Sequence, residues 1–328
     1  MTSRTGGHLE ASAEPVPFDQ AALVVRRGSD SVFESYRGLA DRDHNHPITA
    51  QTRFQIASIS KSFTAVACLL MVKTGRLTLS DPVWGAITPH HLLTHTSGLG
   101  HWPAYPELDL LQPIDPDREI EIFKSHPLAF PTGSRYQYSS PGYVVLADLV
   151  QRAAHVPYRD AITERILRPL ALSNTVVGNH APDRRRANGY EHGRPTPPFE
   201  LDTVGRGAGD LWSTASDLSE WMGSLMHGAI LEPAAQQRML SPQVAVADAD
   251  LANPVRATHY GYGISLTMLD GEPFLFHTGH NPGFRALAGF LPEREVTFAY
   301  LSNEETTDLA VVMGGLRPML TSVSRRRR

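Results

Sequence analysis

The chain has 328 residues, of which 41% are hydrophobic and 20% charged, a composition typical of a globular enzyme. A formal net charge of −4 gives no general attraction to nucleic acid or anionic membranes, and one cysteine excludes an intramolecular disulfide. The longest apolar run, around residues 65–72, is too short to cross a bilayer, and residues 1–17 lack the apolar core of a secretion signal. We therefore expect a cytoplasmic protein without nucleic-acid or membrane partners, and we expect residues 1–17 and 321–328 to be disordered.

The first part of the chain predicts a β-hairpin and then a long buried helix. Residues 21–25 form an apolar run, Gly28 marks a turn, and residues 31–38 alternate well enough to be the partner strand. The helix is expected to start within residues 54–63, to bury one apolar stripe and to end at Gly75, a residue that commonly follows a helix.

A short helix with several histidines is expected next. Thr88 is its predicted N-cap and Gly98 its stop. The histidines of this segment, His90, His91 and His95, raise the question of a metal site, but adjacent residues on a helix point apart and no carboxylates accompany them. We therefore predict structural hydrogen bonds for these histidines and no bound metal.

The rest of the chain changes from a helical to a strand-like pattern near Tyr260. Helices are expected near residues 119–125, 144–154, 158–167, 214–226 and 232–239. The glycine-rich run Gly205–Asp210 predicts a tight loop rather than a phosphate site, because no βαβ context surrounds it. Strands are expected at residues 262–268, 273–278, 285–291 and 296–301, followed by a closing helix over 308–320.

These elements predict a single α/β (α+β) domain over residues 1–328. Strands from residues 18–60 and 255–320 would pair in one antiparallel sheet flanked by helices. Residues 61–254 would form a mostly helical inserted lobe. A ligand site is expected in the cleft between the two lobes.

Ser58 and Lys61 carry the first chemical signal. Residues three apart lie one turn apart on the same helix face, so the amine can reach the hydroxyl. At a helix N-terminus Ser58 would have backbone N–H groups near a developing oxyanion, and a desolvated Lys61 would have a pKa low enough to take the serine proton. Lysine is rare in this chain, which otherwise uses arginine. Taken alone, however, the spacing favours an N-capping serine beside a solvated lysine.

Two further motifs favour a catalytic role for Ser58 and Lys61 instead. Ser58-Ile59-Ser60-Lys61, Tyr138-Ser139-Ser140 and His277-Thr278-Gly279 occur in the order and at the distances of the three active-site motifs of serine β-lactamases and penicillin-binding proteins. The chain resembles this superfamily over roughly residues 20–318. The class C branch of the superfamily contains class C β-lactamases, D,D-carboxypeptidases, D-aminopeptidases and related esterases and transacylases. The stretches that resemble this branch are residues 54–63, 91–98, 138–143, 211–218 and 277–284. The tripeptide Lys73-Thr74-Gly75 has the usual lysine form of the third motif, but it falls at the expected end of the Ser58 helix and is therefore not the third motif.

The resemblance implies a β-lactamase/transpeptidase-like fold and a role for each matched residue. Ser58 would be acylated, Lys61 would hold or remove its proton, and Tyr138 would carry protons to the leaving group and during deacylation. The backbone N–H groups of Ser58 and His280 would form the oxyanion hole.

The third motif would lie on the strand that lines the cleft, with Thr278 and Gly279 beside the substrate. Two departures limit the choice of substrate. His277 stands where true β-lactamases have lysine, so a permanent positive charge for a substrate carboxylate is lost, unless a residue such as Arg285 compensates. Ser140 stands where the second motif usually has asparagine, and its shorter side chain cannot hold a substrate amide carbonyl in the same way.

We therefore predict a serine hydrolase that forms an acyl-enzyme on Ser58, needs no cofactor and acts on a small ester or amide. An ester is favoured because it needs no amide-holding asparagine and no protonated amine as leaving group. The alternatives are a biosynthetic transacylase or D-amino-acid peptidase, then a β-lactamase or D,D-carboxypeptidase. A catalytically silent binding module is the alternative of another class. The acyl donor, the acceptor and the oligomeric state do not follow from the sequence.

Overall fold

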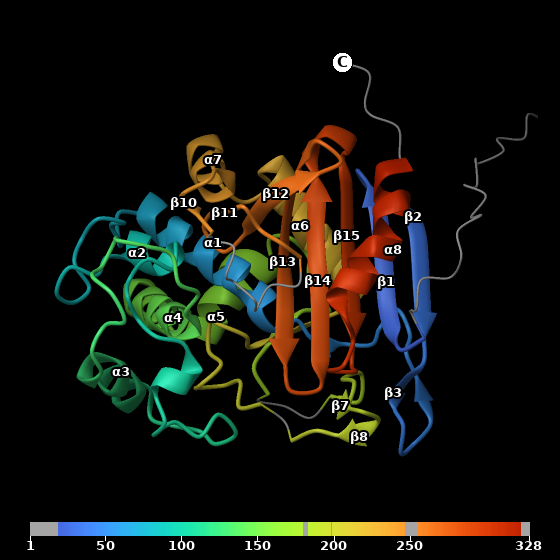
Figure 1. Ribbon diagram of the computed structural model, residues 1–328, viewed down its shortest axis with the longest axis horizontal. Coiled ribbons are helices and arrows are strands. Elements are labelled where there is room, and N and C mark those ends of the chain that lie inside the picture. Colours follow the sequence, from blue (N-terminus) through green and yellow to red (C-terminus); the bar gives the residue numbers. More distant parts are fainter. Residues whose placement is uncertain (1–18, 180–182, 198, 247–254, 323–328) are drawn as a thin grey trace, which may run out of the picture.

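The structure, a computed structural model, describes residues 19–179, 183–197, 199–246 and 255–322 and is built on one large antiparallel sheet (Figure 1). Its eight strands lie in the order β10-β11-β12-β13-β14-β15-β1-β2. They are β1 (Ala21–Arg27), β2 (Asp30–Arg37), β10 (Val244–Ala245), β11 (His259–Tyr260), β12 (Ser265–Leu269), β13 (Glu272–Asn281), β14 (Phe284–Leu291) and β15 (Val296–Ser302). The predicted antiparallel sheet is therefore confirmed.

The two ends of the chain meet inside this sheet. β1 pairs antiparallel with β15, with Ala21 opposite Ser302, and it pairs with β2 on its other side, as the hairpin pattern predicted. β1 is buried on both faces: Leu23 belongs to the apolar core on one side of the sheet and Val24 to the core on the other. A strand covered on both faces is expected to be a continuous apolar run, and residues 21–25 are one.

Helices cover both faces of the sheet. In Figure 1, α8 (Leu309–Ser322) crosses the near face and α6 (Ala215–His227) lies behind the sheet, where it contacts β1 and β15. The other helices are α1 (Ser60–Lys73), α2 (Pro89–Leu93), α3 (Pro116–Ser125), α4 (Ser140–Ala154), α5 (Tyr158–Ile162), α7 (Pro233–Leu240), the 3₁₀ turns η1 (Ala57–Ile59), η2 (Trp102–Ala104) and η4 (Pro292–Arg294), and the π-helical turn η3 (Thr163–Leu167).

Three small sheets complete the described fold. The first pairs β3 (Leu39–Asp41) with β4 (His46–Pro47), and the second places β9 (Leu211–Ser213) between β5 (Phe54–Gln55) and β6 (Val176–Val177). The third pairs β7 (Tyr190–Glu191) with β8 (Arg194–Pro195). The helical elements α1 to α5 gather beside the large sheet (Figure 1). α6 falls within the residues assigned to the helical lobe from the sequence, yet it packs on the sheet.

The helix that carries Ser58 begins later than predicted. Phe54 and Gln55 form strand β5, so the helical segment starts with the 3₁₀ turn at Ala57 and continues as α1. Its end is as predicted, because Gly75 follows the last turn with a left-handed φ of 69°. Lys73 and Thr74 are the last residue and the C-cap of α1, which confirms that Lys73-Thr74-Gly75 is not the cleft motif.

Two other helix boundaries also differ from the prediction. α2 ends at Leu93 rather than Gly98, because the Thr94 hydroxyl donates to the His90 carbonyl and His95 takes a left-handed φ of 58°. α4 begins at Ser140, four residues before the predicted start.

The predicted disorder of the termini lies largely outside the described residues. Residues 1–17 and 323–328 are not described, whereas 321 and 322 belong to α8. Within the described ranges, no helix combines the length and apolar character needed to cross a membrane.

Candidate active site

Ser58 stands on a strained turn where the chain passes from β5 into α1. It is the middle residue of η1 and is half-buried. Ala57 before it has a φ of 48°, a conformation that costs a residue with a side chain about 1 kcal/mol or more. β5 holds the turn from the other side through its pairing with β9. The strain is thus supported by the neighbouring structure, as expected where a side chain must be held in one position.

The side chain of Lys61 is fully buried beneath Ser58. Its Nζ donates to Ser58 Oγ at 3.0 Å, to Ser140 Oγ at 3.1 Å and to the Ala208 carbonyl at 2.7 Å. Burial holds the pKa of the Lys61 amine well below its usual range, and the Asp210 carboxylate acts against this shift. An amine of lowered pKa is more readily neutral, and a neutral amine at this distance can accept the Ser58 proton.

The second motif reaches Lys61 because it forms the start of α4. Ser139 is the N-cap, and its Oγ accepts the Gly142 N–H at 3.2 Å, which leaves the Ser140 hydroxyl directed at the Lys61 amine. The Tyr138 ring lies 4.9 Å from Lys61 Nζ. The structure therefore brings the residues of the first two motifs into one contact group.

His95 supports this motif from within the core. Its Nδ1 accepts the backbone N–H of Ser139 at 3.1 Å, and its ring centre lies 4.3 Å from that of Tyr138 and 4.7 Å from that of Tyr260. Burial, with Lys61 nearby, lowers the pKa of His95 well below its usual range, so the ring is a neutral acceptor.

The neighbouring histidines are also structural, as predicted. His90 Nδ1 lies 2.8 Å from the Tyr262 hydroxyl, and His91 Nδ1 accepts the Thr88 N–H at 3.2 Å to complete the cap of α2. In the part of the chain that the structure describes, His, Cys, Asp and Glu nowhere gather in threes around a possible metal position.

His277 on β13 is a buried, neutral side chain. Its Nε2 lies 3.0 Å from the Tyr260 hydroxyl and its Nδ1 2.7 Å from the carbonyl of Thr278, itself half-buried. Burial and the nearby Lys61 lower the pKa of His277 to about 3, so it carries no charge near neutral pH. The Nε of Arg285, the residue considered as a compensating charge, donates to the Glu305 backbone carbonyl in the β15–α8 connection.

Gly279 lets β13 pass directly against the Ser58 turn. A Cβ at this position would lie 2.3 Å from the Ile56 carbonyl oxygen, closer than any side chain tolerates. The glycine of the third motif is therefore required by the close contact of β13 with the Ser58 turn. The next residue, His280, turns its ring outward to Glu305, with His280 Nε2 2.7 Å from Glu305 Oε1.

Comparison with known proteins relates the whole arrangement to one family. The family described as Beta-lactamase matches residues 17–315, which is nearly the entire chain. The chain belongs to the beta-lactamase family. The superfamily and the fold expected from the three motifs are thereby confirmed. The prediction that the protein is a hydrolytic enzyme of this superfamily is confirmed as well.

Relatives of this beta-lactamase family protein include several kinds of enzyme. It is 33% identical over 210 residues to Esterase EstB from Burkholderia gladioli, covering 56% of this chain and 53% of the esterase, so it spans about half the length of that relative. It is 25% identical to Penicillin-binding protein 4* of Bacillus subtilis, over 90% of this chain and 70% of that protein. Among solved structures, the octameric penicillin-binding protein homologue from Pyrococcus abyssi superposes with a TM-score of 0.80 at 25% identity, covering 92% of this chain and 74% of that one.

A cavity of about 360 Å³ opens beside Ser58 in this beta-lactamase family protein. Ser58 and Ser140 line it, together with the loop residues Ala208 and Gly209. His101 lines it too, and its Nδ1 accepts the Ser140 N–H at 3.4 Å. Burial and the nearby lysine amine lower the pKa of His101 to about 4, so this ring is also neutral.

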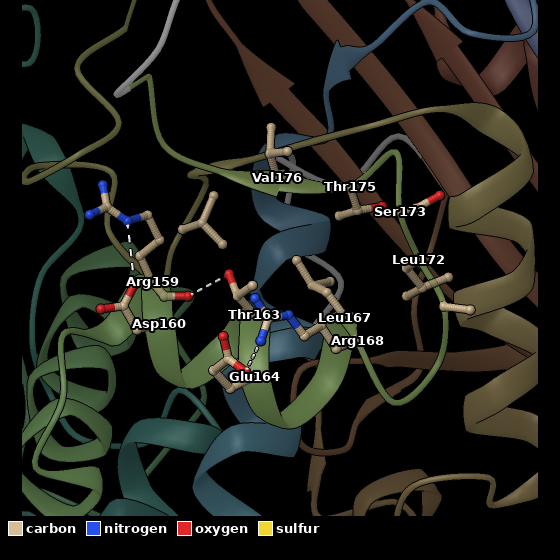
Figure 2. Close-up of a pocket in the computed structure, with 12 residues that line it drawn as sticks. Arg159, Asp160, Thr163, Glu164, Leu167, Arg168, Leu172, Ser173, Thr175 and Val176 are labelled. Atoms are coloured by element: carbon tan, nitrogen blue, oxygen red, sulfur yellow. Dashed lines mark hydrogen bonds and ion pairs between the residues drawn. The ribbon is translucent and has the colours of Figure 1, made fainter.

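A larger hollow of about 590 Å³ lies around η3, away from the three motifs (Figure 2). Its charged side chains pair among themselves: Arg159 lies beside Asp160, and Glu164 contacts Arg168 (Figure 2). None of the motif residues lines it. The cavity at the three motifs is therefore not the larger of the two, and cavity size alone does not locate the candidate active site of this beta-lactamase family protein.

Several residues that build the site were not predicted from the sequence. Asn281 Nδ2 donates to Gln55 Oε1 at 2.7 Å and to the Gly209 carbonyl at 3.0 Å, which ties β13 to β5 and to the loop beside Lys61. The glycine-rich run was correctly predicted as a loop, but its delivery of the Ala208 carbonyl to Lys61 was missed. The position of Asn281 two residues after the third motif was the available signal.

Proposed function

We propose that this protein hydrolyses small carboxylic esters through an acyl-enzyme on Ser58. The observation that carries the proposal is the buried Lys61 amine, held 3.0 Å from Ser58 Oγ by two further acceptors. A serine hydroxyl is a weak nucleophile until a neighbouring base takes its proton. Lys61 is the basic group in hydrogen-bond contact with it.

In the acylation step, Lys61 accepts the Ser58 proton while Oγ forms a bond to the ester carbonyl carbon. The carbonyl oxygen becomes an oxyanion, and the backbone N–H groups of Ser58 and His280 are the proposed donors to it. Tyr138 then passes a proton to the alcohol oxygen as the carbon–oxygen bond breaks, and Lys61 restores the proton of Tyr138 through the contact group that they share.

Deacylation repeats the same movements with water in place of Ser58. A water molecule loses a proton toward Tyr138 and Lys61 as it attacks the acyl carbon, and Ser58 leaves with a proton. The carboxylic acid is the second product. No cofactor takes part in either step.

Two features of the site favour an ester over a β-lactam or a peptide. His277 is neutral near pH 7, so the third motif offers no fixed charge to a substrate carboxylate. The Ser140 hydroxyl bonds to Lys61 and replaces the longer amide expected at this position. The esterase relative, 33% identical over 56% of this chain, supports the same choice.

The alternatives rest on the same acyl-enzyme. A transacylase or a D-amino-acid peptidase would differ in the acceptor or in the leaving group, and a β-lactamase or D,D-carboxypeptidase would need a carboxylate contact. A silent binding module would not need Ser58, Lys61 and Tyr138 in contact. The class C branch and a cytoplasmic location stay predictions from the sequence.

The test measures intact-protein mass and product release after brief exposure to p-nitrophenyl butyrate and, separately, to a penicillin. Ser58→Ala is compared with the wild type and with Ser60→Ala, a neighbouring helix serine whose Oγ accepts the Leu211 N–H. We expect turnover of the ester and an acyl mass in the wild type and in Ser60→Ala, and a loss of about 10³-fold or more in Ser58→Ala.

The penicillin sample distinguishes the alternatives. A stable penicillin adduct on Ser58 would favour a D,D-peptidase, and rapid opening of the β-lactam ring would favour a lactamase. If Ser58→Ala keeps the ester activity of the wild type, the assignment of the nucleophile is wrong.

A further inference from the structure

The cavity beside Ser58 has two chemically different walls. Trp102, Leu110 and Phe199 form an apolar side. Glu305, from the β15–α8 connection, lines the cavity with His280 near the end of β13, and the two side chains form a charged part of the wall. At about 360 Å³ the space is at the small end of the range for ligand sites, so it holds one compact group rather than a long chain.

The position of Tyr138 determines which part of an ester enters this cavity. If Tyr138 protonates the leaving alcohol, as the proposed function requires, the alcohol lies on the side of Tyr138 and His277, whose rings are 6.4 Å apart. Neither residue lines the cavity, whereas Ser58 does. The acyl group, on the other side of the attacked carbon, therefore points into the cavity.

Glu305 is held rigidly as a carboxylate at the cavity wall. Its Oε1 lies 2.7 Å from His280 Nε2, and its Oε2 accepts the Gly283 N–H at 2.8 Å. Partial burial acts to raise its pKa, but these hydrogen bonds and the nearby Arg285 outweigh it and hold the pKa of Glu305 below its ordinary value.

No described residue that lines this cavity is a lysine or an arginine. The guanidinium of Arg285 donates to the backbone carbonyl of Glu305 and does not line the cavity. An acyl group that ends in a carboxylate would therefore meet the Glu305 carboxylate and an apolar wall, and the two basic groups nearest to Glu305, His280 and Arg285, are already hydrogen-bonded to that residue. An uncharged apolar group meets no such penalty.

We propose that the acyl group of the substrate is compact, apolar and free of negative charge, and that Glu305 is the specificity-determining residue that rejects acyl groups ending in a carboxylate. This inference rests on the proposed ester hydrolysis at Ser58. It names the class of acid that the enzyme releases: a small uncharged monocarboxylic acid rather than a dicarboxylic half-ester.

The test compares two esters that share one acyl chain and differ in the charge at its end. They are p-nitrophenyl hydrogen glutarate, whose acyl group ends in a carboxylate, and p-nitrophenyl methyl glutarate, in which that carboxylate is capped as a methyl ester. We expect the wild type to prefer the capped ester by about tenfold or more in kcat/KM, and Glu305→Gln to reduce this preference by about tenfold. Gln keeps the shape and removes the charge; its amide oxygen can accept the Gly283 N–H, and its amide nitrogen then faces His280 Nε2, which must act as the acceptor.

Glu304→Gln is the matched control. Glu304 pairs with Arg42 at 2.9 Å and does not line the cavity, so its loss should leave the preference unchanged. The wild-type preference should also shrink as salt is raised, because exposed like charges are screened. A structural effect of the substitution would not follow salt.

The outcomes separate this inference from the proposed function. Equal turnover of both esters by the wild type, or equal changes in Glu304→Gln and Glu305→Gln, would overturn the role of Glu305 while leaving ester hydrolysis intact. Absence of any turnover and of any acyl mass on Ser58 would overturn both.

Discussion

Asp210 has surroundings unlike those of an ordinary acidic side chain. Its carboxylate is fully buried two residues beyond the carbonyl that binds Lys61, and neither oxygen makes a well-aligned hydrogen bond with a described residue. Burial raises the pKa of Asp210 to about 7, although the N–H groups of Gly207 and of Asp210 itself and the Arg206 guanidinium act against it. The charge of Asp210 in turn raises the pKa of the Lys61 amine.

We therefore predict that Asp210→Asn moves the pH dependence of ester hydrolysis. In the proposed mechanism the neutral Lys61 amine is the active form, so kcat/KM should rise with pH through the lowered pKa of Lys61. Removing the negative charge of Asp210 lowers that pKa further, and the acid limb should shift to lower pH. The measurement is kcat/KM for p-nitrophenyl butyrate against pH in both proteins.

Asp202→Asn is the control for this shift. Asp202 lines the same small polar cavity as Asp210 and is exposed, but it is not among the charges that act on Lys61. An acid limb that stays in place in Asp210→Asn, or moves to higher pH, would contradict the link between the two groups.

Asp210→Asn should also change the pH dependence of stability. The pKa of Asp210 is raised on folding, so its protonated form is favoured in the folded state. The stability associated with that form is complete below the ordinary pKa of 3.8 and is lost as pH rises through about 7. The melting temperature of Asp210→Asn relative to wild type should therefore increase between these two pH values.

At the scale of elements, Asn281 joins three segments that the chain brings together from distant positions. Asn281→Ala leaves the Gln55 amide oxygen and the Gly209 carbonyl without their donor. We predict a loss of about 1–3 kcal/mol in the free energy of unfolding. We also predict a fall of about 10-fold to 100-fold in kcat, because the Ser58 turn and the loop bound to Lys61 lose their common support.

Asn303→Ala separates these two effects. Asn303 is equally buried, and its Nδ2 donates to the carbonyls of Leu39 and Asn188, away from the cavity beside Ser58. It should lose stability in urea unfolding but keep the kcat of the folded protein. Equal loss of kcat in both variants would show that Asn281 acts only through stability.

Most of the elements could be predicted from local patterns, and the boundaries that failed have identifiable physical causes. α2 ends shortly before His95, which takes a left-handed φ of 58° although it has a side chain. A prediction that places the end of a helix at the next glycine does not identify this position. α4 begins at Ser140 because Ser139 caps it, although Gly142 in the first turn reads as a helix breaker. At α4 the Ser139 cap overrides local propensity. At α2 the hydrogen bond from the Thr94 side chain to the His90 carbonyl overrides it.

The site was predictable to the extent that its residues belong to linear motifs. Ser58, Lys61 and Tyr138 follow from order and spacing, and the structure brings them into contact. The Ala208 carbonyl and the Asn281 amide leave no such signature, because a backbone acceptor can belong to any residue and a buried amide is recognised only by its distant partners.

At the scale of the whole molecule, Arg294 fastens α8 to the sheet. Its guanidinium makes two bonds to the Glu272 carboxylate, at 2.8 and 2.6 Å, and one to the Thr321 carbonyl at 2.5 Å. Both side chains of the ion pair are largely buried, with exposed fractions of 12% and 2%. We predict that Arg294→Met lowers the free energy of unfolding by about 3–5 kcal/mol, because Glu272 would be left as a buried charge without its main partner.

Arg317→Met is the control, since Arg317 pairs with Asp270 in a solvent-exposed contact close by. It should leave the urea midpoint nearly unchanged, and kcat should be preserved in both variants. A urea midpoint that responds equally to the two substitutions would mean that burial of the Arg294–Glu272 pair does not increase its contribution to the free energy of unfolding.

The pairing of β1 with β15 also determines when, during synthesis, the chain can complete its fold. Ser58 leaves the ribosome early, but β13 and β14, which contact its turn, and β15, which completes the pairing of the sheet with β1, are made near the end of synthesis. Contacts between such distant parts of a chain form slowly and only after both parts exist. We therefore expect a nascent chain to contain Ser58 long before it has the contacts of the complete site, so chains that lack β13 to β15 should not show the proposed ester hydrolysis.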